Sequence, residues 1–120
     1  KTKLLAVSVL TSMNKKNLSE IGHTKQLDKL VIHLSKLAKK AGAYAMICSP
    51  HESKKIKELS KLPSITPGIR LPGDQSGDQK RIATPRFAFD NGAIGIVMGR
   101  SLIKGNIKNN FKRLFQHLDS

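Results

Sequence analysis

Two arginines have the neighbours that an anion site needs. Arg70 ends the run Pro67-Gly68-Ile69-Arg70, and Arg100 directly follows Gly99; each comes just after a short apolar segment. The guanidinium group presents a fixed fork of N–H donors that fits phosphate oxygens, and a neighbouring glycine lets a backbone N–H approach an anion closely. The pair therefore predicts a phosphate site, with two solvated arginines at loop starts as the alternative.

The segments around these arginines indicate an α/β fold. Short, nearly continuous apolar runs are typical of strands buried on both faces; they cover residues 4–10, 43–48, 64–66 and 93–98. Helical spacing of apolar residues is clearest at 25–41 and from Ile107 onward. Two more helices begin at Ser49-Pro50 and Thr84-Pro85, and Glu52 completes the signature of a capping box with Ser49.

Strand and helix thus alternate four times, which predicts parallel strands joined by right-handed crossovers. Ligands of such proteins bind at the carboxyl ends of the strands. Both arginines therefore fall on the same rim, after adjacent strands. Periodicity alone leaves two architectures open, a small open sheet and half of an eight-unit barrel.

The composition narrows the classes of function. The 120 residues suffice for one modest domain, and they carry 22 Lys and Arg against 8 Asp and Glu, a net charge of +14. Such an excess can serve nucleic acid. The lysines are scattered over helix faces, however, and aromatic residues are few, so we expect no nucleic-acid partner. No apolar run approaches the ~20 residues that span a bilayer, so we expect no membrane partner either.

The remaining reactive side chains predict no further site. Cys48 is the only cysteine, which excludes an intrachain disulfide, suits a reducing cytoplasm and favours a packed strand residue over a nucleophile. The four histidines share no metal-ligand spacing, and we expect no metal; they are His23, His33, His51 and His117.

Six blocks of the sequence resemble the bacterial branch of the orotidine 5'-phosphate decarboxylases. They are LLAVSVLTSM at 4–13, CSPHE at 48–52, ITPGIR at 65–70, GDQ at 77–79, RIATP at 81–85 and MGR at 98–100. The blocks occur in the family's order and at roughly its spacing. The resemblance implies four βα units equivalent to the second half, strands 5–8, of a TIM (β/α)₈ barrel, with residues 1–120 as a single truncated domain.

The family converts orotidine 5'-monophosphate to UMP and CO₂ in pyrimidine biosynthesis, without a cofactor and normally as a homodimer. By match to its motifs, Thr11 would contact the nucleotide near the pyrimidine, and Arg70 and Arg100 would hold the phosphate. Gly99 would supply a backbone N–H. Gln79 would sit on the loop that closes over phosphate and base.

The resemblance also implies that the catalytic residues are missing. The family's catalytic unit, a Lys with alternating Asp residues, would lie upstream of Lys1, as would its ribose-binding residues. Asp28-Lys29 lies on the polar face of a helix and favours a surface ion pair, and Asp74 lies in a glycine-rich loop. We therefore assign no catalytic residue. Ser101 stands where the family usually has Pro, which concerns only the path of the loop.

Three functions remain open at this point. The first is the phosphate-binding half of the decarboxylase, inactive alone and requiring a complementing N-terminal half. The second is a non-catalytic nucleotide- or phosphate-binding half-barrel that self-associates through its exposed strand edges. The third, a basic nucleic-acid binder, has only the net charge in its favour.

Overall fold

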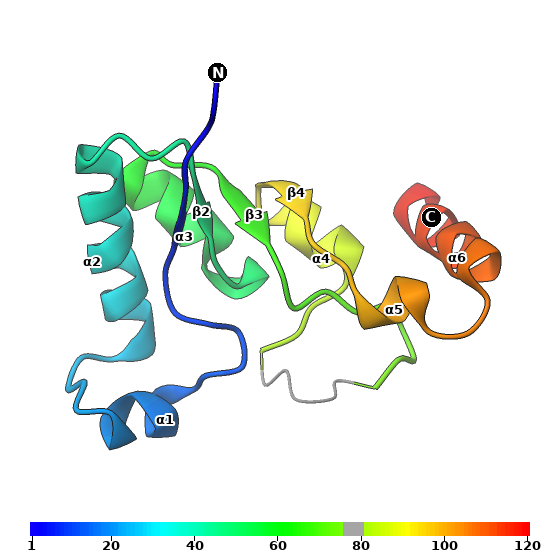
Figure 1. Ribbon diagram of the computed structural model, residues 1–120, viewed down its shortest axis with the longest axis horizontal. Coiled ribbons are helices and arrows are strands. Elements are labelled where there is room, and N and C mark those ends of the chain that lie inside the picture. The colour runs from blue at the N-terminus through cyan, green and yellow to red at the C-terminus, as the bar shows by residue number, and fades with distance from the viewer. Residues whose placement is uncertain (76–80) are drawn as a thin grey trace.

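The computed structural model describes residues 1–75 and 81–120, and its centre is a parallel sheet of four strands (Figure 1). The strands pair in chain order, β1 to β2 to β3 to β4. Their bounds are β1 Leu5–Val7, β2 Ala45–Ile47, β3 Ser64–Thr66 and β4 Ala93–Ile96. The parallel pairing that the strand-helix alternation predicts is confirmed in all three strand pairs.

Helices follow each strand on the way to the next. They are α1 Lys15–Glu20, α2 Leu27–Lys40, α3 Pro50–Ser60, α4 Pro85–Asp90, α5 Arg100–Ile103 and α6 Ile107–Asp119. The sequence signals explain most of their ends. Ser49 caps α3 by accepting a hydrogen bond from the His51 N–H at 3.3 Å, and Thr84 caps α4 in the same way. Glu52 does not complete the expected capping box, and its carboxylate accepts a hydrogen bond from Arg81.

The main core lies between the sheet and helices α2 and α3. Its buried members include Val31 from α2, Met46 from β2 and Ile56 from α3, each fully enclosed. A smaller cluster around Ile69 and Ala88 packs under α4. Aliphatic side chains thus supply the packing, as the scarcity of aromatic residues requires.

The opposite face of the sheet is open. Exposed aliphatic side chains lie on the two edge strands or just beyond them: Leu5, Val7, Ile94 and Val97. Strands β1 and β4 also present unpaired edges, since each has a neighbour on one side only. This open face and the two edges are the parts of the sheet that another chain or segment could cover.

Replacing Ile56 by Ala tests the main core. Ile56 is fully buried, so its loss should lower the free energy of unfolding by about 3 kcal/mol, from lost transfer energy and the cavity left behind. Urea denaturation followed by circular dichroism measures the change. Leu59→Ala is the matched control, because Leu59 lies on the same helix with half of its surface exposed. Equal destabilisation by the two substitutions would contradict this description of the core.

Candidate functional site

The loops that follow β3 and β4 meet around a pocket of about 380 Å³. Its lining residues come from these two loops and from helices α5 and α6: Arg70, Gly73, Asp74, Gln75, Arg100, Ser101, Lys104, Asn110 and Arg113. Arg70 and Arg100, which the sequence places on one rim, line this same pocket. Of these nine described residues, four have cationic side chains and one has an acidic side chain.

Backbone contacts fix the position of Arg70. Its N–H donates to the Ala83 carbonyl at 2.9 Å, and Ile69 forms a parallel β-bridge with Ala83. The guanidinium Nη1 donates to the Ile69 carbonyl at 2.9 Å, and the residue is largely buried. Gly68, just before this bridge, has φ +75°, in the region that favours glycine. The loop therefore holds Arg70 in one place at the wall of the pocket.

Arg100 is the first residue of α5, a four-residue helix that the sequence analysis does not predict. The next residue, Ser101, is buried, and its hydroxyl accepts a hydrogen bond from the Leu71 N–H at 3.3 Å. This bond ties the loop after β4 to the loop after β3. A proline at this position would carry no such acceptor, so Ser101 makes a link here that proline could not.

Helix α6 supplies two residues of the wall that sequence reasoning misses. The Asn110 side-chain amide donates to the Leu102 carbonyl at 2.9 Å and to the Lys104 carbonyl at 2.8 Å, which fastens α5 to α6. Arg113 pairs with Asp74 at 2.9 Å and also donates to the Pro72 carbonyl. The only sequence signal is polar spacing of three residues beside the apolar stripe of α6, which is common on helix surfaces.

The charge balance of the pocket favours an anion. Burial by itself would raise the pKa of Asp74. Hydrogen bonds from Arg113 and Ser101, together with the charges of Arg113 and Arg70, outweigh that effect and hold the pKa below its usual value. Asp74 is therefore ionised at neutral pH. Among the described lining residues one carboxylate faces four cationic side chains, so this set keeps a net positive charge.

Two further residues that the resemblance assigns to the site, Thr11 and Gly99, are not among the residues that line this pocket. Thr11 lies just beyond β1 and is buried, and its carbonyl accepts a hydrogen bond from the Arg81 N–H at 3.2 Å. Gly99 directly precedes α5, and its carbonyl accepts from the Leu102 N–H at 2.9 Å. Gln79 lies outside the described residues.

Cys48 has the character of a packed residue. Burial foremost, with the Glu52 charge, raises the pKa of its thiol to about 12, so the thiol is neutral at physiological pH. In residues 1–75 and 81–120, no three His, Cys, Asp or Glu side chains come together as metal ligands do. No helix in the same ranges is long and apolar enough to cross a membrane.

Known proteins match this chain in both sequence and structure. Residues 1–110 match the family model described as orotidine 5'-phosphate decarboxylase / HUMPS family. The orotidine 5'-phosphate decarboxylase of Wolbachia sp. subsp. Brugia malayi is 44% identical over 116 residues, which are 95% of this chain and 51% of the relative. That of Pseudoalteromonas translucida is 44% identical over 105 residues, 86% of this chain and 45% of the relative.

The crystal structure of orotidine 5'-phosphate decarboxylase from Lactobacillus acidophilus superposes with a TM-score of 0.75 at 33% identity, covering 98% of this chain and 50% of that one. The fold is shared as well with the Methanocaldococcus jannaschii enzyme complexed with inhibitor BMP, at a TM-score of 0.65 and 23% identity. These structures are TIM barrels, so the four βα units correspond to half of a (β/α)₈ barrel, the half with strands 5–8.

The fold and the basic rim pocket thus define half of a (β/α)₈ barrel with a positively charged pocket at the ends of its strands. The chain belongs to the orotidine 5'-phosphate decarboxylase family. It spans about half the length of the curated relatives that it matches.

Replacing Asp74 by Asn tests the charge arrangement of the pocket. Because the folded protein lowers the Asp74 pKa, this group stabilises the fold above the unfolded pKa of about 4, and the contribution is lost as pH falls through the folded pKa. At pH 7 the substitution should cost about 0.5 kcal/mol, a small value because Arg113 is 43% exposed.

Urea denaturation at pH 7 and at pH 3 measures both stabilities, and the gap between the wild type and Asp74→Asn should narrow at pH 3. Asp90→Asn is the control, because Asp90 is exposed at the end of α4. A stability difference of the same size at both pH values would show that the charge of Asp74 does not stabilise its contact with Arg113.

Proposed function

We propose that this chain is the phosphate- and nucleotide-binding half of an orotidine 5'-phosphate decarboxylase, which converts orotidine 5'-monophosphate to UMP and CO₂. The observation that carries the proposal is the meeting of Arg70 and Arg100 on one positively charged pocket. Family membership supports the nature of the ligand, as does the inhibitor in the Methanocaldococcus jannaschii enzyme. The single cysteine suits the cytoplasm as the compartment.

In this proposal each residue acts on the bound nucleotide. The guanidinium forks of Arg70 and Arg100 hold the phosphate oxygens, and Gly99 donates its backbone N–H to the same group. Thr11 contacts the nucleotide near the pyrimidine, and Gln79 bridges phosphate and base. Binding energy gathered at the phosphate, remote from the reacting carbon, is thereby available to orient the base and exclude water.

The residues that the structure describes do not complete the chemistry. Replacing CO₂ by a proton at the pyrimidine carbon needs a positioned proton donor. Asp28 pairs with Lys55 at 3.3 Å on the exposed surface, and Asp74 is held by Arg113. Neither offers a Lys with alternating Asp residues at the rim. We propose that the donor belongs to further βα units that complement this 120-residue half-barrel domain. The relatives are about twice as long and so contain enough residues for such units.

Calorimetric titration of the purified chain with inorganic phosphate and with UMP tests the proposal. Both should bind, and Arg100→Ala should weaken phosphate binding by about 10- to 100-fold, because it removes charged hydrogen bonds. Lys36→Ala, on α2 and not among the residues that line the pocket, should leave the affinity unchanged. Absence of binding by the wild type would refute the phosphate site.

An assay for loss of orotidine 5'-monophosphate completes this test. The chain alone should show no turnover above the uncatalysed background, because among residues 1–75 and 81–120 no side chain is placed to protonate the carbon. Turnover that survives further purification would overturn the proposed need for complementing units.

The open face of the sheet favours a second candidate, a half-barrel that pairs with a copy of itself. Leu5 and Val7 on β1, and Ile94 and Val97 at β4, leave about half of each side chain exposed. Two copies joined β4 to β1 would restore eight strands and leave no free edge. In the homodimer the open face would be covered by a second copy of the chain, and in the complemented half-barrel it would be covered by the missing βα units.

Light scattering distinguishes these arrangements. Self-pairing predicts a mass of twice 13.2 kDa, reduced to the monomer by Val7→Asp, which places a charge on the buried face of the dimer. A wild-type chain that remains monomeric across the accessible concentrations would eliminate self-pairing. Glu20→Lys, at an exposed position on the short α1 and not on a strand of the sheet, serves as the charge-changing control.

A further inference from the structure

A short segment, residues 81–83, crosses the ends of three strands. On one side the Arg81 N–H donates to the Thr11 carbonyl at 3.2 Å, just beyond β1. On the other side the Ala83 N–H donates to the Gly68 carbonyl at 3.1 Å, beyond β3. Between them the Ile82 carbonyl lies 3.0 Å from Nε2 of His51, in the first turn after β2. We call residues 81–83 the crossing segment.

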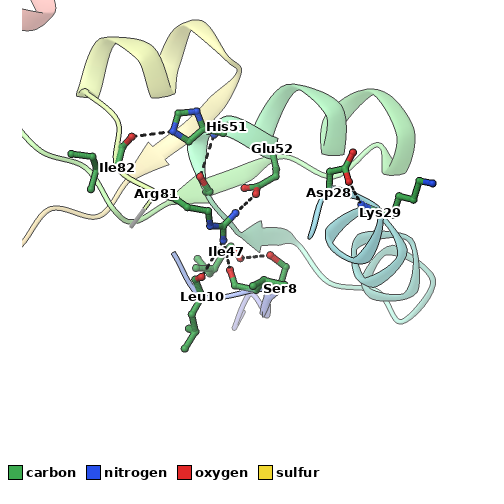
Figure 2. Close-up of polar contacts among 11 residues, drawn as sticks. Ser8, Leu10, Asp28, Lys29, Ile47, His51, Glu52, Arg81 and Ile82 are labelled. Atoms are coloured by element: carbon green, nitrogen blue, oxygen red, sulfur yellow. Dashed lines mark hydrogen bonds and ion pairs between the residues drawn. The ribbon is translucent and has the colours of Figure 1, made fainter. Parts of the chain in front are cut away.

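The side chain of Arg81 fixes this segment at its start. One guanidinium nitrogen donates to the Val9 carbonyl and to the Leu10 carbonyl, both at 3.1 Å, and the other donates to the Glu52 carboxylate (Figure 2). The Arg81 and Glu52 side chains are only 11% and 10% exposed. A guanidinium buried to this extent needs a counter-charge, and Glu52 provides it from the start of α3.

The surroundings leave the crossing segment little freedom. A side chain at Gly68 would bring its Cβ within 3.0 Å of the Arg81 carbonyl oxygen and 3.3 Å of the Thr11 side chain. Burial raises the pKa of Glu52, and the charge of Arg81 offsets this only in part. The pair is therefore a tightly enclosed polar contact whose geometry is set from several sides.

We infer that Arg81, held by Glu52, is a positioning residue for the phosphate pocket. The guanidinium anchors the crossing segment to the end of β1. Ala83, two residues on, accepts the Arg70 N–H and so sets where Arg70 stands in the pocket wall. Arg81 itself does not line the pocket. The inference rests on the proposed function only in taking phosphate as the ligand of that pocket.

The test compares Arg81→Ala with the wild type in the full chain, using inorganic phosphate as the probe. Phosphate affinity should fall about tenfold, because Arg70 loses its fixed orientation while keeping its charge. Millimolar ethylguanidinium, which can occupy the space left by the side chain, should restore most of the affinity. Ethylammonium at the same concentration should not, because it lacks the planar fork. Unchanged affinity in Arg81→Ala, or equal effects of the two cations, would overturn the inference.

Arg86→Ala is the matched control. Arg86 also donates to backbone carbonyls, those of His117, Leu118 and Ser120, but it links α4 to the end of α6 and does not line the pocket. It should lower stability without changing phosphate affinity. An equal loss of affinity in Arg86→Ala would reduce the role of Arg81 to general stability and overturn the assignment.

Hydrogen exchange at the Arg70 amide provides a readout that does not depend on phosphate. Arg81→Ala should speed that exchange about tenfold, whereas Arg86→Ala should leave it unchanged. A wild type that binds no phosphate but shows this effect would refute the proposed ligand and retain the positioning role. Unchanged exchange would refute the role.

Glu52→Gln supplies the test if Arg81→Ala does not fold, since it keeps the shape and removes the counter-charge. It should show the same effects to a smaller degree. An exchange rate and an affinity equal to those of the wild type would then overturn the role of the pair.

Discussion

The pocket depends on holding like charges together. Two arginine side chains, Arg70 and Arg100, approach from different loops, and their mutual repulsion must be borne by contacts elsewhere. Hydrogen bonds counter this repulsion: the bridge between Ile69 and Ala83 fixes one loop, and the bond from the Leu71 N–H to the Ser101 hydroxyl joins it to the other. Asp74 neutralises only part of the charge. The positive charge that remains in the pocket attracts an anion, and the hydrogen-bonded loops hold that charge in place.

The strands of the sheet are only three or four residues long, and the loops beyond them build the pocket. The strands set the order and direction of the chain, and one face is covered by α2, α3 and α4 (Figure 1). Specific geometry begins only beyond the strand ends, where short segments cross from one unit to the next. The half-barrel by itself leaves the open face uncovered and two strand edges unpaired, whereas a closed barrel has neither a bare inner face nor free edges.

Local patterns predict the framework, and tertiary contacts decide the rest. Apolar runs locate all four strands, helical spacing locates α2 and α6, and the capping residues locate the starts of α3 and α4. Helix α5 is too short for any periodicity, and only its glycine at 99 and the strand before it hint at a turn. The roles of Asn110, Arg113 and Arg81 arise from contacts with residues distant in sequence. The resemblance indicates which loops matter, while the contacts within them need the folded chain.

The crossing segment has a consequence for the order of folding. Neighbouring strands of the sheet pair across at most about 40 residues, but the bonds from Arg81 to Val9 and Leu10 close loops of 72 and 71 residues. Closing a longer loop costs more chain entropy before its contacts contribute any stabilisation, so contacts that close long loops form late. The sheet can therefore assemble while its rim is still unformed. The arrangement of the rim that could receive an anion therefore forms only after the loop between Arg81 and Val9 has closed. The appearance of anion binding during refolding would mark the completion of that late step.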